Sequence, residues 1–280
     1  MFNKKTTGGI TMRKTTVQLL FLSLAMCALW MIGMVSVSWA KNDHEAPFSK
    51  AELFFELNNT DGDLGIHASI DGDPWKKLTI EDPRGRKMLN IRANGRLEAQ
   101  GMTELFFESA EPQFEDLSPQ EFFRRFPAGT YEIEGKTLEG NELGSETKLT
   151  HVMPAPPEPT VNALPAAQVC DADDPGYDAT VTHAPVTIAW PAVTTSHPDP
   201  NGGGAGIQPP VPVVIHNYEL VVEVLNQSFP SKFYVMLTPG ETSITIPEEF
   251  IALGTEFKYE VLVREESFNQ TAIESCFVLD

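Results

Sequence analysis

Five consecutive residues, Val186-Thr187-Ile188-Ala189-Trp190, decide the fold of the C-terminal part of the chain. They combine β-branched side chains with a tryptophan, the composition that favours a half-buried strand. Further runs of the same kind follow at Asn217–Val224, Thr242–Pro247, Gly254–Val263 and Thr271–Leu279. Short strands at this spacing, separated by turn residues, predict an all-β sandwich.

In order and spacing these runs resemble a fibronectin type III domain over residues 169–280. Val186–Trp190 is similar to the second strand of that family, with its core tryptophan, and Asn217–Val224 is similar to the third. The family usually has a tyrosine at the corner where Phe257 stands, and phenylalanine lacks the hydroxyl that bonds back to the chain. By fold-level analogy, the resemblance implies a binding role.

Residues 46–153 predict a second, immunoglobulin-like β-sandwich with one short helix. Strand-like runs alternate there with turn signals at Asn58–Asp63, Asp71–Pro74, Asp82–Gly85, Asn94-Gly95 and Glu139–Asn141. The helix is predicted after Ser118, which caps it, with Pro119 in its first turn and Phe122, Phe123 and Phe126 toward the core.

Residues 154–168 form a Pro-rich linker between the two tandem sandwiches. Its Pro154-Ala155-Pro156-Pro157-Glu158-Pro159 stretch predicts stiff polyproline II, which would hold the domains apart.

The N-terminus has the parts of a secretory signal peptide over residues 1–40. Met12-Arg13-Lys14 precedes an apolar run from Val17 to Val37, and Ser38-Trp39-Ala40 has the small residues that signal peptidase reads. We expect cleavage after Ala40 and a secreted or periplasmic protein. The alternative is an uncleaved anchor, because the apolar run is nearly long enough to span a bilayer.

Cleavage would leave Cys170 and Cys276, which bracket the second sandwich. In an exported chain two cysteines predict one disulfide, the alternative being two unpaired thiols.

Charge excludes two classes of partner. The formal net charge is −19, and the first 40 residues hold four basic side chains, Lys4, Lys5, Arg13 and Lys14, and no acidic one. The rest of the chain is therefore more acidic than the whole, and we expect neither nucleic acid nor, after signal cleavage, a membrane as partner.

Asn59, Asp61 and Asp63 have the alternate spacing of a calcium loop, with Asp71 and Asp73 nearby in sequence. An EF-hand would need glycine and glutamate where Leu64 and Ile70 stand, so the motif is not an EF-hand. Two acidic hairpin turns are the alternative to a calcium site, and no other cofactor is predicted.

A long segment, Pro191–Pro212, separates the second and third strands of the second sandwich, where the family has a short loop. Its glycines favour a disordered excursion, and its place at the end of the sandwich favours a binding element. On either interpretation, shortening it should leave stability nearly intact.

No catalytic motif emerges from the sequence. We therefore expect an exported, non-enzymatic binding or adhesion-type module for a protein or glycan partner. The alternatives are a carbohydrate-active enzyme with a fibronectin type III accessory domain and a structural envelope protein.

Overall fold

The computed structural model describes residues 45–198 and 210–280. The predicted signal peptide (1–40) and the tip of the long segment (199–209) lie outside these ranges. The strands are β1 (Lys50–Asn58), β2 (Asp63–Glu81), β3 (Lys87–Arg92), β4 (Met102–Glu108), β5 (Gly129–Thr137), β6 (Glu142–Leu149), β7 (Thr160–Val161), β8 (Leu164–Pro165), β9 (Thr180–Thr182), β10 (Thr187–Ala189), β11 (Ile215–Val224), β12 (Lys232–Leu237), β13 (Ser243–Thr245), β14 (Glu256–Glu265) and β15 (Gln270–Leu279). The helices are α2 (Arg96–Gln100), α3 (Pro119–Arg125) and α4 (Glu248–Ile251). In the described ranges no helix is long and apolar enough to cross a membrane.

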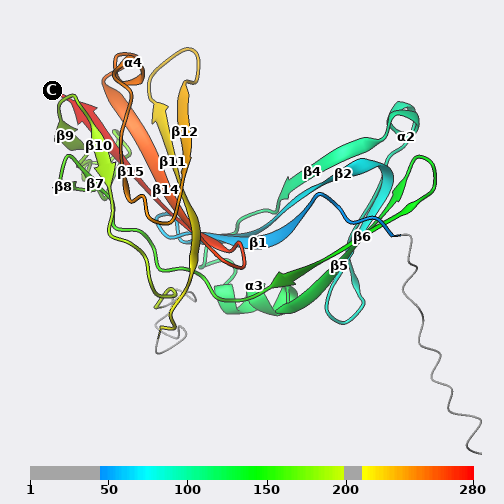
Figure 1. Cartoon of the computed structure of the whole chain (residues 1–280). Coiled ribbons are helices and arrows are strands. Elements are labelled where there is room, and N and C mark those ends of the chain that lie inside the picture. Colours follow the sequence, from blue (N-terminus) through cyan, green and yellow to red (C-terminus); the bar gives the residue numbers. More distant parts are fainter. Residues whose placement is uncertain (1–44, 199–209) are drawn as a thin grey trace, which may run out of the picture. The chain divides into compact units, whose positions relative to one another are not determined.

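The strands form two sheets, which confirms the all-β prediction. The larger sheet runs β12-β11-β14-β15-β1-β2-β5-β6, with β3 and β4 paired to β2 and β9 paired to β15. The smaller sheet runs β13-β10-β7-β8. Figure 1 shows β11, β12, β14 and β15 side by side.

The C-terminal half has the sandwich that the fibronectin type III resemblance implies. The predicted second strand and the strand before the corner are β10 and β13, which pair in the smaller sheet. The predicted third, sixth and last strands are β11, β14 and β15, which are neighbours in the larger sheet. Between the sheets lies a buried apolar cluster in which Phe257 stacks on Phe277 with ring centroids 4.8 Å apart. At the corner position, the phenylalanine thus contributes to packing.

In the N-terminal half, the turn predicted at Asp71–Pro74 is wrong. β2 passes through it as one strand that pairs first with β1 and β4 and then with β3 and β5. The Phe48 ring packs on Gly72 so closely that a Cβ there would lie 2.8 Å from Cδ1. Gly72 therefore provides space for an aromatic ring within an extended strand.

The hairpin predicted at Asn94-Gly95 is also wrong. β3 and β4 flank this dipeptide but both pair with β2, and helix α2 lies between them. Gly95 does have a positive φ of 63°, as expected for a turn. The prediction was wrong about the strand with which β3 and β4 pair. By contrast, the turns predicted at Asp82–Gly85 and Glu139–Asn141 do join paired strands, β2 to β3 and β5 to β6.

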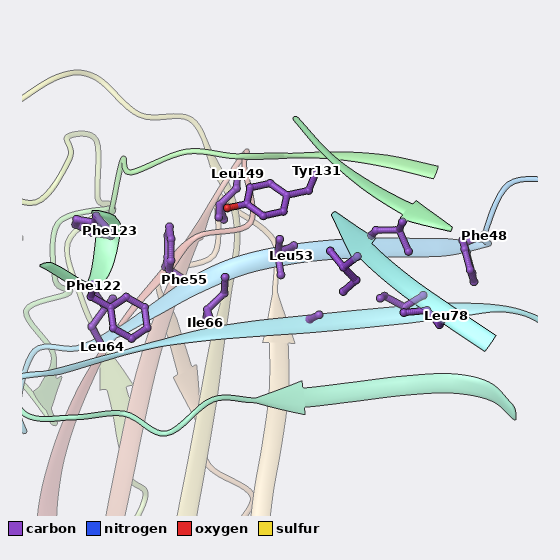
Figure 2. Packing of buried hydrophobic residues seen from close by; sticks show 14 of the residues in the cluster. Phe48, Leu53, Phe55, Leu64, Ile66, Leu78, Phe122, Phe123, Tyr131 and Leu149 are labelled. Carbon is purple, nitrogen blue, oxygen red and sulfur yellow. The ribbon is translucent and has the colours of Figure 1, made fainter. Parts of the chain in front are cut away.

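A second buried cluster fills the N-terminal half. Figure 2 shows its side chains, among them Phe55, Leu64, Phe122, Phe123 and Tyr131, gathered between the strands and helix α3. The helix begins as predicted, since the Ser118 hydroxyl accepts a hydrogen bond from the backbone N–H of Glu121 and Pro119 occupies the first turn.

The segment predicted as a spacer differs from expectation. Thr160–Val161 and Leu164–Pro165 form β7 and β8, so residues 154–168 already contribute to the smaller sheet. Immediately before them, the Pro154 carbonyl accepts a 2.8 Å hydrogen bond from the Thr271 hydroxyl of β15. The prediction that residues 154–168 hold the two domains apart is therefore wrong. The domain boundaries themselves stay predictions.

The two halves meet where β1 pairs with β15 in parallel, Glu56 opposite Gln270 and Asn58 opposite Ala272. The centre of this junction is Asn269, which is completely buried. Its amide oxygen accepts from the Phe55 N–H at 2.8 Å, and its amide nitrogen donates to the carbonyls of Thr150 and Val152 at 3.0 and 2.8 Å. One side chain thus satisfies three backbone groups from two segments.

The stem of the long segment Pro191–Pro212 is also fixed. Ser196 N donates to the Val211 carbonyl at 2.8 Å, and His197 N donates to the Met153 carbonyl at 2.7 Å. The His197 ring shares a 2.8 Å hydrogen bond with the side chain of Asn59. These contacts argue against the expectation that shortening leaves stability nearly intact, because the stem links the two halves; that expectation stays a prediction.

Candidate functional site

One histidine and two glutamates gather beside the junction, and we call Glu56, His67 and Glu111 the junction cluster. The His67 Nε2 lies 2.9 Å from Glu111 Oε1, and Nδ1 lies 3.8 Å from Glu56 Oε2. One potential ligand atom from each of the three side chains lies within 4.8 Å of the other two. The His67 side chain is only 5% exposed, against 19% for Glu56 and 25% for Glu111.

The hairpin register positions the first two members. In the β1–β2 pair, His67 stands opposite Phe54, and Glu56 stands opposite Gly65, so Glu56 and His67 are diagonal neighbours on one face. Their aromatic neighbours are Phe54, with ring centroids 5.4 Å from His67, and Phe106 of β4 at 6.3 Å. An imidazole buried in this way is held in one orientation.

The third member, Glu111, comes from the loop after β4. Ser109 holds the start of this loop to β2, because its N–H donates to the Ile66 carbonyl and its hydroxyl accepts from the Ile66 N–H, both at 3.0 Å. The Glu111 carboxylate then lies over Gly65, where a Cβ would come 2.2 Å from Oε1. Glycine at this position makes room for the carboxylate.

Residues of the C-terminal half orient Glu56. Gln270 of β15 donates through Nε2 to the Glu56 carboxylate, and its Oε1 accepts from Arg264 Nε at 2.9 Å. The Arg264 guanidinium in turn lies 4.6 Å from the centre of the Phe54 ring. The junction cluster is therefore supported from both halves of the chain.

The surroundings of the cluster are strongly acidic. Burial raises the pKa of Glu56, with Glu111 and Glu108 adding to the increase. Burial and the neighbouring Glu111 and Asp61 raise the pKa of Asp63 to about 6. Burial and the neighbouring Glu56 and Glu274 raise the pKa of Glu260 on β14 to about 8. This accumulation of carboxylates favours a bound cation.

The five predicted calcium residues do not come together. Asn59 and Asp61 lie in the turn between β1 and β2, and Asp63 begins β2. Asp71 stands eight residues further along the same strand, which corresponds to about 26 Å, and Asp73 lies beyond it. A single shell of all five is therefore excluded, while calcium at Asn59, Asp61 and Asp63 alone stays a prediction.

Cys170 and Cys276 form the predicted disulfide, with their Cα atoms 5.7 Å apart. The bond ties the segment before β9 to strand β15 and closes a sequence separation of 106 residues.

A separate feature is the edge of the larger sheet at β12, which pairs only with β11 in the described part of the chain. Phe233 and Val235 of this strand pack toward the core, so the alternate residues Tyr234 and Met236 point outward. They are 54% and 58% exposed, and Phe229, just before the strand, is 76% exposed. We call Phe229, Tyr234 and Met236 the edge patch.

The sequence interpretation missed both features for identifiable reasons. It placed His67 on a strand but sought histidines at helical metal spacings, whereas Glu111 lies 44 residues away in a loop. The informative signal was a histidine inside the apolar run Leu64–Ile70, directly after a predicted hairpin turn. The run Phe233–Leu237 is apolar throughout, which predicts a strand but does not indicate that Tyr234 and Met236 are exposed.

The chain has only low similarity to known proteins. No family model matches the chain, and no curated protein matches it. Among solved structures, the chicken CNTN1 FN1–FN3 domains share 11% identity with a TM-score of 0.31, covering 84% of this chain and 65% of theirs. The tetra-tandem repeat of the extending region of a large adhesion protein shares 13% identity with a TM-score of 0.25, covering 82% of this chain and 49% of the repeat.

A calcium-stabilised adhesin with which an Antarctic bacterium binds ice has a TM-score of 0.24 at 13% identity, over 83% of this chain and 50% of that one. This chain thus spans 65% of the first structure and about half of the other two. All three scores are low, so the description of the fold rests on the strand order of the chain itself.

Proposed function

We propose that the chain is an exported, non-catalytic binding module of the adhesion type, which docks a protein or glycan partner on the edge patch. The observation that carries this proposal is the exposure of Phe229, Tyr234 and Met236 at a sheet edge. Aromatic residues and methionine are enriched in the centres of protein interfaces. An exposed apolar edge strand is otherwise an aggregation hazard that soluble proteins avoid.

The geometry of the edge favours a protein over a glycan. Within residues 45–198 and 210–280, β12 has no strand on its outer side, so its backbone can pair with an added strand. Tyr234 and Met236 would specify which strand binds. Tyr234 is held in place because its hydroxyl donates to Glu219 Oε2 at 2.8 Å. The Cys170–Cys276 disulfide fits an oxidising compartment, as export predicts.

Replacement of Tyr234 and Met236 by serine is expected to abolish partner binding and leave the fold intact. Both side chains are more than half exposed, so their loss should change the free energy of unfolding by less than about 0.5 kcal/mol each. The measurement is binding of the purified chain to a glycan array and to extracted envelope proteins, with photo-cross-linking from position 234. Phe106→Ser, which removes another exposed aromatic residue (60% exposed) on β4, is the matched control.

Three results would contradict the proposal. Hydrolysis of an array glycan would favour the carbohydrate-active enzyme. Binding that survives the double replacement but is lost in the Phe106 control would move the docking site to β4. Absence of any partner, with the chain retained in an insoluble envelope fraction, would favour the structural protein.

A further inference from the structure

We propose that Glu56, His67 and Glu111 bind one divalent transition-metal ion of the zinc class beside the junction of the two halves. This inference is independent of the edge patch and of the partner proposed to bind there.

The ligand types suit such an ion. Zinc binds imidazole nitrogen and carboxylate oxygen at about 2.0–2.2 Å, so two ligand atoms on a tetrahedral ion stand about 3.3 Å apart. In the junction cluster, His67 Nε2 lies 2.9 Å from Glu111 Oε1 and His67 Nδ1 lies 3.8 Å from Glu56 Oε2, and one potential ligand atom from each of the three side chains lies within 4.8 Å of the other two. One imidazole nitrogen would bind the ion, and water would complete the shell.

The site is built rather than incidental. The His67 side chain is 5% exposed and lies between the rings of Phe54 and Phe106, and each of its nitrogens lies next to one of the two carboxylates. Gly65 leaves the space that the Glu111 carboxylate occupies. Gln270 donates to Glu56, which is the kind of supporting hydrogen bond that orients metal ligands.

Charge favours the same conclusion. Asp63, Glu108 and Glu260 lie near enough to Glu56 or Glu111 to interact with them electrostatically. Lys258, which interacts with Glu260, is paired with Glu274. A divalent cation would offset this excess of negative charge.

The buried imidazole decides the class of ion. Calcium prefers six to eight oxygen ligands and takes no nitrogen from this shell, whereas imidazole suits zinc, copper, nickel and ferrous iron. The junction cluster shares no residue with the calcium prediction at Asn59, Asp61 and Asp63.

The test uses the full chain without an affinity tag, first treated with EDTA and then titrated with zinc chloride by calorimetry and thermal melting. We expect one equivalent of zinc to bind and to raise the melting temperature, because an ion that binds only the native state stabilises it. Glu111→Gln keeps the size of the side chain and should weaken binding at least tenfold, and His67→Gln should abolish it. Glu104→Gln, which removes an exposed carboxylate of β4, should bind zinc like the parent.

Cobalt(II) provides a second measurement that does not depend on stability. We expect visible d–d absorption for a low-coordinate Co²⁺ complex in the parent and in Glu104→Gln, and its loss in Glu111→Gln. Zinc affinity and cobalt spectrum that are unchanged in Glu111→Gln would overturn the proposal. Stabilisation by calcium but not zinc that depends on Glu111 would overturn the assigned class of ion.

Discussion

Alanine in place of Phe55 is expected to lower the free energy of unfolding by about 3–5 kcal/mol, the usual cost of removing a buried phenylalanine ring. The Phe55 ring is completely buried and makes edge contacts with Phe122 and Phe123 of α3, at centroid distances of 6.0 and 5.1 Å. Loss of the ring would leave a cavity between helix α3 and strand β1. Since its backbone N–H also binds Asn269, disorder at this position would spread to the junction.

Chemical denaturation followed by tryptophan fluorescence measures the effect. Phe229→Ala is the matched control: the same side chain is removed just before β12, where it is 76% exposed, and the expected loss is below about 0.5 kcal/mol. Similar losses for the two variants would show that Phe55 is not the centre of the N-terminal cluster.

Removal of the disulfide is expected to cost about 2–5 kcal/mol, because its loss restores the freedom of a long loop in the unfolded chain. The change is the double replacement Cys170→Ala and Cys276→Ala, alanine being preferred because Cys276 is buried. Denaturation with and without reductant measures the effect. The parent should fall to the level of the double variant when reduced, and the variant should not respond.

Two results would contradict this prediction. Two alkylatable thiols in the native parent would show that the bond is not formed in solution. Equal stability of the parent and the double variant would show that the sandwich does not depend on it.

The C-terminal half was largely predictable from sequence because its signals are local. The run Val186–Trp190 and the alternation in Asn217–Val224 and Gly254–Val263 place β10, β11 and β14 within a few residues. The disulfide followed from the cysteine count and the signal peptide pattern. Each of these inferences needs only residues close in sequence or the rule that exported cysteines form disulfides.

Features that depend on distant contacts were not predictable. Asp71–Pro74 has the composition of a turn, yet the Phe48 ring and the pairing on both sides keep β2 extended. The Phe55–Asn269 bond joins residues 214 positions apart, and parallel pairing of β1 with β15 leaves no periodic trace in either strand. The junction cluster also depends on distant contacts, because the pairing of β4 with β2 brings Glu111 to His67.

The two halves of the chain form one structural unit joined at β1 and β15. Asn269 makes this claim testable, because its replacement by alanine leaves the Phe55 N–H and the Thr150 and Val152 carbonyls without their partner. A buried group left unsatisfied costs about 1–3 kcal/mol.

Differential scanning calorimetry of the parent and of Asn269→Ala is the most direct measurement. We predict one transition for the parent, with equal calorimetric and van't Hoff enthalpies, and a lower midpoint for the whole transition in the variant. Two resolved transitions in the parent, of which the replacement shifts only one, would contradict the claim and show two sandwiches that unfold independently.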